Sequence, residues 1–237
     1  MTNGNQDTRF SWFIPIDGDG ARAGTNRAER PPDFDYLRKV VQTAEDEGFY
    51  SLLIPTRFAN GLFAEDAPLA ETWTTATALA AVTKRIRFLI AVRPGFVALG
   101  LFAQMAAALH QISKGRIDIN IVPGGIQNDF ERVGEYTDQS TRYERAEEFI
   151  EALRVMWSTT DPVDYEGEHV QLRGAFVVTD GAFEIPLLVV DAAQIVKREG
   201  RPRISLDGPF VLTLGGVGEA EFLEAHAELQ PPRSGLV

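Results

Sequence analysis

Short apolar runs alternate with amphipathic segments along the first two thirds of this chain, and this alternation limits the fold more than any other feature. Each run is followed by a loop and then by a segment whose apolar residues recur at helical spacing. Strands that alternate with helices pair in parallel through right-handed crossovers. The sequence therefore predicts an α/β fold in which four strands lie parallel and adjacent in chain order. These strands begin near Phe10, Ser51, Arg87 and Ile117.

The fourth unit shows the pattern most clearly. Its helix is expected over residues 101–112, and Gly115 in the following Ser-Lys-Gly-Arg segment can adopt the left-handed conformation that ends many helices. A β-branched strand over 117–122 leads into the turn Pro123-Gly124-Gly125. Asn120 lies near the carboxyl end of that strand, which is the end where parallel α/β folds bind ligands.

The segments beyond this turn continue the pattern less regularly. We expect a polar loop over 124–141 and a helix over 143–157. Residues 163–178 alternate in polarity and turn at Glu166-Gly167, which predicts a β-hairpin. Further strands are predicted over 186–190 and 210–214, and further helices over 192–198 and 219–229.

Length and charge narrow the class of protein. A chain of 237 residues fits one α/β domain spanning 1–237, and its 44% of hydrophobic residues can fill a core. The net charge of −11 argues against nucleic acid or an anionic membrane as a partner. There is no Cys, and the three His lie far apart without metal-ligand spacing, so no metal site is expected. With no signal peptide visible and no apolar run of about 18 residues, we expect a cytoplasmic protein.

Six segments recur in the order and spacing of a known family. They are Trp12-Phe-Ile-Pro-Ile-Asp-Gly-Asp-Gly20, Leu53-Ile-Pro-Thr56, Thr83–Pro94, Ile112-Ser-Lys-Gly-Arg116, Asn120, and Ser140-Thr-Arg-Tyr143 followed by Glu147-Glu-Phe149. Over about residues 10–176 the chain resembles the bacterial luciferase-like flavin-dependent monooxygenase superfamily, and most closely its alkanesulfonate monooxygenase branch. The resemblance implies a TIM barrel that binds reduced FMN supplied by a separate flavin reductase. It also implies that O2 is used to oxygenate a small organic substrate, such as an organosulfonate.

Residues 177–237 diverge from that family and are shortened. Where a Gly-rich phosphate loop is expected, the chain reads Leu187-Leu-Val-Val-Asp-Ala-Ala193, and Asp207 and Pro209 stand where the family has an Arg and a His. A shortened relative in the same superfamily, the nonfluorescent flavoprotein of luminous bacteria, keeps flavin binding on an incomplete barrel. The resemblance therefore implies a TIM-barrel-like (β/α) fold that is incomplete in its C-terminal half.

Candidate cofactor-binding residues follow from position and from the resemblance. Asn120 can donate and accept hydrogen bonds at an isoalloxazine edge, although it can equally cap a loop. The Tyr143 hydroxyl can bond the flavin or its phosphate, or it can be the wet tip of a packed aromatic ring. Arg93 suits a phosphate or sulfonate, although in so acidic a chain it can instead pair with a carboxylate. The resemblance adds Thr56, and the turn at Pro123-Gly124-Gly125 adds Gly124, whereas no catalytic residue can be assigned.

Aromatic and acidic residues give two weaker signals. Trp73 is the candidate substrate-binding residue, because with Trp12 and Phe13 it can wall a flat-ring pocket. The alternative for Trp73 is a core position, which is commoner for large aromatic side chains. Asp17 and Asp19 look like paired carboxylates, but the glycines beside them mark them as turn residues.

Two functions remain open from the sequence. The first is a two-component, reduced-FMN-dependent monooxygenase acting on a small organic substrate. The second is a noncatalytic flavin-binding or dimerisation protein derived from that family by loss of the active-site half. In either case an incomplete barrel leaves sheet edges and apolar faces uncovered, so we expect a homodimer formed through helices between Trp73 and Ile112.

Overall fold

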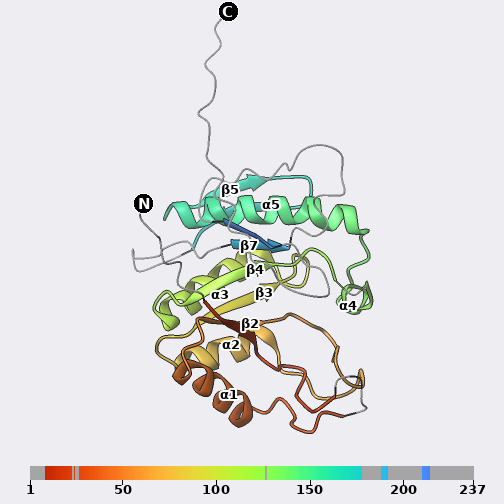
Figure 1. Ribbon diagram of the computed structural model, residues 1–237. Coiled ribbons are helices and arrows are strands. Elements are labelled where there is room, and N and C mark those ends of the chain that lie inside the picture. Colours follow the sequence, from red (N-terminus) through yellow and green to blue (C-terminus); the bar gives the residue numbers. More distant parts are fainter. Residues whose placement is uncertain are drawn as a thin grey trace, which may run out of the picture.

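The computed structural model describes residues 9–22, 24, 27–125 and 127–177, together with the strands at 188–191 and 210–213. A parallel sheet of six strands in the order β1-β2-β3-β4-β7-β8 organises this part of the chain (Figure 1). The strands are β1 Ser11–Phe13, β2 Ser51–Ile54, β3 Arg87–Val92, β4 Ile117–Ile121, β7 Leu188–Asp191 and β8 Phe210–Thr213. The helices are α1 Phe34–Asp46, α2 Thr72–Ala81, α3 Leu99–Ser113, α4 Gln127–Arg132 and α5 Gln139–Ser158.

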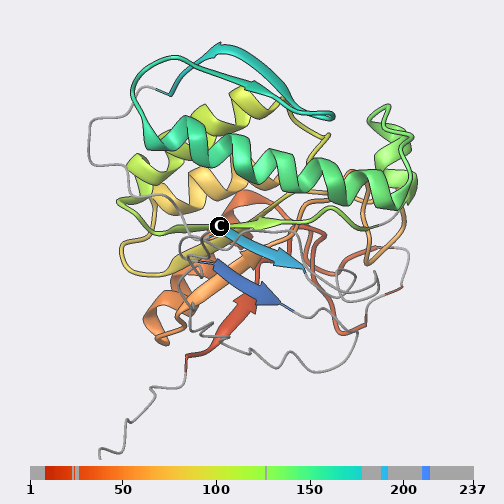
Figure 2. The same ribbon diagram turned by 90° about the horizontal axis from the view of Figure 1, so that it is seen from above.

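The predicted strand arrangement is confirmed. β1, β2, β3 and β4 are parallel neighbours in chain order, with Leu53 opposite Leu89 and Ala91 opposite Asn120. β7 and β8 extend the same sheet in parallel. The sheet curls, with helices on its outer side (Figure 2), but β1 and β8 end the strand order and are not paired with each other in the described part of the chain. The fold is therefore the expected incomplete TIM-barrel-like arrangement.

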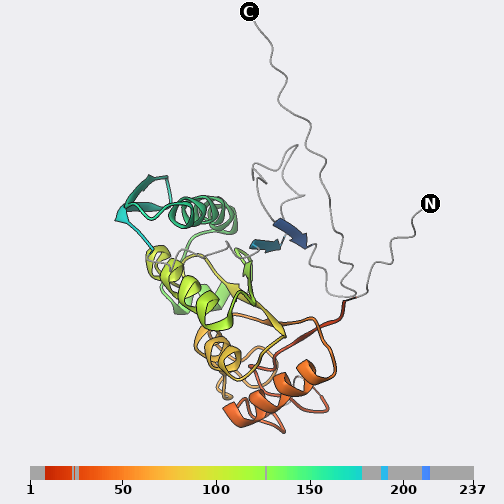
Figure 3. The same ribbon diagram turned by 90° about the vertical axis from the view of Figure 1, so that its left-hand side faces the viewer.

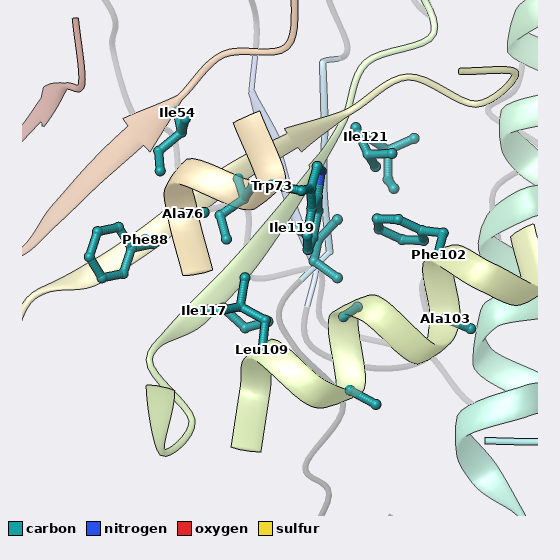
Figure 4. Close-up of a cluster of buried hydrophobic side chains, with 14 of the residues drawn as sticks. Ile54, Trp73, Ala76, Phe88, Phe102, Ala103, Leu109, Ile117, Ile119 and Ile121 are labelled. Atoms are coloured by element: carbon teal, nitrogen blue, oxygen red, sulfur yellow. The ribbon is translucent and has the colours of Figure 1, made fainter. Parts of the chain in front are cut away.

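The hydrophobic core lies between the sheet and the helices. Alternate residues of β2, β3 and β4 face α2, α3 and α5, which lie on one side of the strands in Figure 3. Phe102 of α3 is fully buried and meets the Trp73 ring edge-on, with 4.9 Å between ring centroids (Figure 4). Burying a side chain of this size contributes about 1.5–3 kcal/mol. The core sheet residues are Leu52, Ile54, Phe88, Ile90, Val92, Ile117, Ile119 and Ile121.

Side chains cap the amino ends of α1, α2 and α5. Asp138 accepts a hydrogen bond from the Thr141 amide, so α5 begins at Gln139, before the predicted start at Tyr143. The expected polar loop over 124–141 was wrong in part, because α4 forms within it around a single buried apolar side chain, Phe130. A six-residue helix with one apolar anchor carries no periodic signal.

The segment after α3 contacts the carboxyl ends of two helices. Lys114, with φ of 58°, is the first left-handed residue, and Gly115 follows with φ of 80°, so the predicted glycine cap begins one residue early. The Arg116 guanidinium then donates to backbone carbonyls at the carboxyl ends of α2 and α3, including those of Ala80 and Ser113. These carbonyls would otherwise lack partners. The family-like Ser-Lys-Gly-Arg segment therefore joins two helix ends.

The predicted hairpin is confirmed, with a longer connection than expected. β5 Val163–Glu166 and β6 Gln171–Ala175 are antiparallel, and the connection is a four-residue loop over 167–170. The Glu148 carboxylate of α5 accepts the amides of residues 168, 169 and 170. The helices predicted over 192–198 and 219–229 lie outside the described residues. Within the described part of the chain, no helix has the length and apolar character needed to cross a membrane.

Candidate functional site

The carboxyl ends of β2, β3 and β4 bring most of the predicted site residues to one edge of the sheet. Thr56 follows β2, Arg93 follows β3, and Gly124 follows β4, while Tyr143 reaches this edge from α5. Ligands bind at this edge in parallel α/β folds. The order of strands therefore gathers residues that are far apart in sequence.

A turn over residues 123–125 is held from both sides at this edge. A Cβ atom on Gly124 would lie 3.3 Å from the Tyr143 hydroxyl, and one on Gly125 would lie 3.0 Å from the Arg93 guanidinium carbon. The Arg142 Nε donates to the Pro123 carbonyl at 3.2 Å. Gly125 has φ of 129°, which L side chains rarely adopt. Gly125 is thus required by its conformation and by its approach to Arg93, whereas a side chain at Gly124 would crowd the Tyr143 hydroxyl.

Arg93 is buried, with 4% of its surface exposed, and its Nη1 donates to the Asp129 carboxylate at 3.0 Å. Its Nε is buried and has no hydrogen-bond partner among the described residues. Burial lowers the pKa of Arg93, and the nearby positive charges of Arg57 and Arg142 act in the same direction, while Asp129 opposes them. The ion pair is the alternative that the acidic composition suggested, and the cofactor role of Arg93 stays a prediction.

Asn120 lies on the face of β4 opposite to the core residues Ile119 and Ile121. Its Oδ1 is buried and has no hydrogen-bond partner among the described residues. Buried polar atoms are almost always paired, and exchanging the amide oxygen and nitrogen would only leave a donor unpaired instead of an acceptor. A ligand group at this position would supply the missing partner.

Thr56 and Trp73 donate hydrogen bonds to the same backbone carbonyl. The Thr56 hydroxyl donates to the Ala91 carbonyl at 2.5 Å, and the Trp73 indole Nε1 donates to it at 3.1 Å. Thr56 keeps its lone pairs available as acceptors at the ligand edge. Trp73 is 7% exposed and packs on Phe102, which is the core position named as its alternative. Its substrate-binding role therefore stays a prediction without support from this placement.

Three residues of the site were not found from the sequence. Asp129 and Phe130 lie on α4, in the segment expected to be a loop, and Arg142 is 4% exposed on α5. Guanidinium carbons of Arg93 and Arg142 lie 5.3 Å and 4.3 Å from the centroid of the Phe130 ring. The sequence signal for Arg142 is the family-like Ser140-Thr-Arg-Tyr143 segment, which contains it.

The loops after β1 and β2 are joined by a separate network. Asp17, 2% exposed, accepts from Arg57 Nε at 3.1 Å and from the Gly61 amide at 2.7 Å. The Asp19 carboxylate instead accepts hydrogen bonds from Tyr36 and Arg30. These bonds lower the pKa of Asp19, and the bond from Tyr36 has the largest effect. The two carboxylates therefore serve different loop contacts and form no acid–base pair.

Comparisons with known proteins identify the family and the fold. The sequence model of a family described as Luciferase-like monooxygenase matches residues 8–196. A structure of riboflavin lyase with modified FMN and riboflavin aligns with a TM-score of 0.67 at 20% identity, over 78% of this chain and 50% of that one. EDTA monooxygenase from Chelativorans sp. BNC1 aligns with a TM-score of 0.66 at 17% identity, over 77% and 48%. The oxygenating constituent of 3,6-diketocamphane monooxygenase from Pseudomonas putida, in complex with FMN, aligns with a TM-score of 0.60 at 18% identity, over 77% and 51%.

These solved structures share the fold at low identity, and the chain spans about half of their length. The family match carries more weight, because it covers most of the sequence and includes β1 to β4, α4 and α5. The residues at the carboxyl edge of the sheet lie inside that match. The chain belongs to the luciferase-like monooxygenase family.

Proposed function

We propose that this protein binds FMN at the carboxyl edge of β2, β3 and β4, as a two-component monooxygenase that receives reduced FMN from a separate flavin reductase. The observation that carries the proposal is the convergence of Arg93, the 123–125 turn and Tyr143 beside Asn120, whose Oδ1 lacks a partner among the described residues. Such an unpaired buried atom and a turn with two consecutive glycines fit a flat, polar-edged ring system better than a packed core.

The side chains have distinct roles in this proposal. Asn120 offers an amide that can donate and accept at the edge of the isoalloxazine ring. Tyr143 places a hydroxyl against the turn, and the Thr56 hydroxyl oxygen can accept at the same edge. Reduced FMN, when bound, supplies the electrons for the activation of O2. The chain itself positions the ring.

The substrate is proposed to be a small organic molecule, with organosulfonates as the first class to test. Two features support this choice. The sequence resembles the alkanesulfonate branch, and buried guanidinium groups of Arg93 and Arg142 lie near the turn. Planar guanidinium groups bind sulfonate and phosphate oxygens through paired hydrogen bonds.

A noncatalytic flavin-binding protein is the second candidate. It is favoured by Asp207 and Pro209, because neither can replace the Arg and His expected from the resemblance. Both positions lie outside the described residues.

Turnover with a flavin reductase separates the two candidates. The purified protein is mixed with FMN, NADH, a flavin reductase and an alkanesulfonate, and O2 uptake and sulfite release are measured against the reductase alone. Sulfite release that depends on the protein supports the monooxygenase. FMN binding without product, across several organosulfur substrates, supports the noncatalytic candidate. Absence of FMN binding removes both.

A further inference from the structure

Arg93 and Asp129 form a buried ion pair that joins two loops of the site. The Arg93 side chain is 5% exposed and the Asp129 side chain is 3% exposed. Asp129 also lies 3.8 Å from Arg132 and receives the Phe58 amide at 3.5 Å. One carboxylate on α4 therefore contacts the loops that follow β2 and β3. Burying such a pair is costly unless all of its hydrogen-bonding groups find partners.

The pair leaves one donor of Arg93 unused beside the turn. The Arg93 Nε is buried and has no hydrogen-bond partner among the described residues. After the larger effect of burial, the nearby positive charges of Arg57 and Arg142 also lower the pKa of Arg93. An oxyanion bound at Nε would satisfy the buried donor and offset these charges.

We propose that Arg93 is the recognition group for an oxyanion of the bound ligand, and that Asp129 is the positioning residue that holds its guanidinium against the Gly124–Gly125 turn. This inference rests on the proposed FMN site and specifies its polar end. The oxyanion has two possible sources, the phosphate of FMN and the sulfonate of a substrate. Gly125 lies against the guanidinium, since a Cβ atom there would be 3.4 Å from the Arg93 Nε.

Paired titrations with FMN and riboflavin test the phosphate source, because the two ligands differ only in the phosphate. Asp129→Asn should raise the Kd for FMN about tenfold or more and leave the Kd for riboflavin unchanged. Asp129→Glu, which keeps the charge, should recover part of the difference. A thermal-shift titration with 1-butanesulfonate tests the other source. Stabilisation seen with the unmodified protein and lost in Asp129→Asn assigns the subsite to the sulfonate.

Loss of folding is separated from loss of recognition by two further variants. The double variant Arg93→Met/Asp129→Leu replaces the pair by apolar side chains, which generally restores stability. It should regain the melting temperature but not the preference for FMN over riboflavin or the response to butanesulfonate. The control is Asp118→Asn, which breaks the ion pair of Arg87 with Asp118 near the amino ends of β3 and β4. It should lower stability and leave the ratio of the two Kd values unchanged.

The outcomes are distinct. If the double variant regains FMN preference or the sulfonate response, the pair is only structural and the inference is wrong. It is also wrong if Asp129→Asn changes neither ligand's binding while remaining folded. If the unmodified protein binds neither FMN nor riboflavin, the proposed function fails first, and a butanesulfonate response that depends on Asp129 would then still support the oxyanion subsite.

Discussion

At the scale of single residues, Gly125 combines two constraints that can be measured separately. Its φ of 129° disfavours any side chain, and a Cβ atom would come within 3.0 Å of the Arg93 guanidinium. Gly134 has a positive φ of 82° but nothing within 4 Å of its Cβ position, so it is the matched control. Both lie in the connections between β4 and α5.

We expect Gly134→Ala to lower the free energy of unfolding by about 1–2 kcal/mol, which is the cost of a left-handed alanine. Gly125→Ala should cost a further ~1–3 kcal/mol, because it overpacks the contact with Arg93. Urea unfolding of both variants measures the difference. Equal losses would show that Arg93 moves aside freely and does not support the turn.

Glu135 is the residue whose protonation should matter most near the site. Burial raises its pKa, but hydrogen bonds from Thr137 and Arg145 outweigh that effect and place it below the ordinary 4.5. A lowered pKa in the folded state means that the stabilisation is fully present above about pH 4.5 and is lost as the pH falls through the folded pKa.

Glu135→Gln should therefore reduce the decline of unfolding free energy below pH 4.5 relative to the unmodified protein. Urea unfolding between pH 3 and 7, about one unit apart, gives the profile. Glu131→Gln is the control, because Glu131 is exposed and makes no ion pair with a described residue. An equal loss of unfolding free energy at low pH in the Glu135→Gln and unmodified proteins would contradict this role.

At the scale of elements, periodicity identified the strands and long helices because burial on one or both faces leaves a regular pattern. Residues 87–92 read as a strand and form β3, since nearly every side chain in it is covered. The sequence did not predict α4, because its position depends on tertiary contacts of Asp129 and Phe130 with two arginines. The same contacts decide whether Arg93 faces a carboxylate or a ligand. No local pattern encodes partners separated by 36 residues.

The hairpin of β5 and β6 depends on one side chain of α5. Glu148 accepts three consecutive amides in the connecting loop, whereas Glu151 accepts only the Tyr165 hydroxyl. Glu148→Ala should leave those amides without their partner and cost about 1–3 kcal/mol locally. Hydrogen exchange of residues 168–170 should then speed up much more than in Glu151→Ala. Unchanged exchange would show that packing, rather than Glu148, holds the loop.

At the scale of the whole molecule, exposed apolar side chains on α3 support the predicted dimer. On α3, Leu101 is 55% exposed and Ile112 is 47% exposed, and both lie in the segment expected to form the interface. We predict that light scattering at micromolar concentration shows a dimer. The double variant Leu101→Glu/Ile112→Glu should be monomeric, because it buries charge in the interface.

Val155→Glu is the control for this change, since Val155 is 39% exposed but lies on α5. It should remain dimeric. A monomeric unmodified protein, or dissociation by Val155→Glu alone, would contradict an interface formed by α2 and α3.

FMN binding at the carboxyl edge of β2, β3 and β4 can be tested by a fluorescence titration of FMN with the unmodified protein and with Asn120→Ala/Tyr143→Phe. We predict saturable binding to the unmodified protein, weakened in the double variant by roughly 1–3 kcal/mol if both hydrogen bonds are buried. Saturable binding of equal strength to both proteins would place the flavin elsewhere, and no binding to either would contradict a flavin site at this edge.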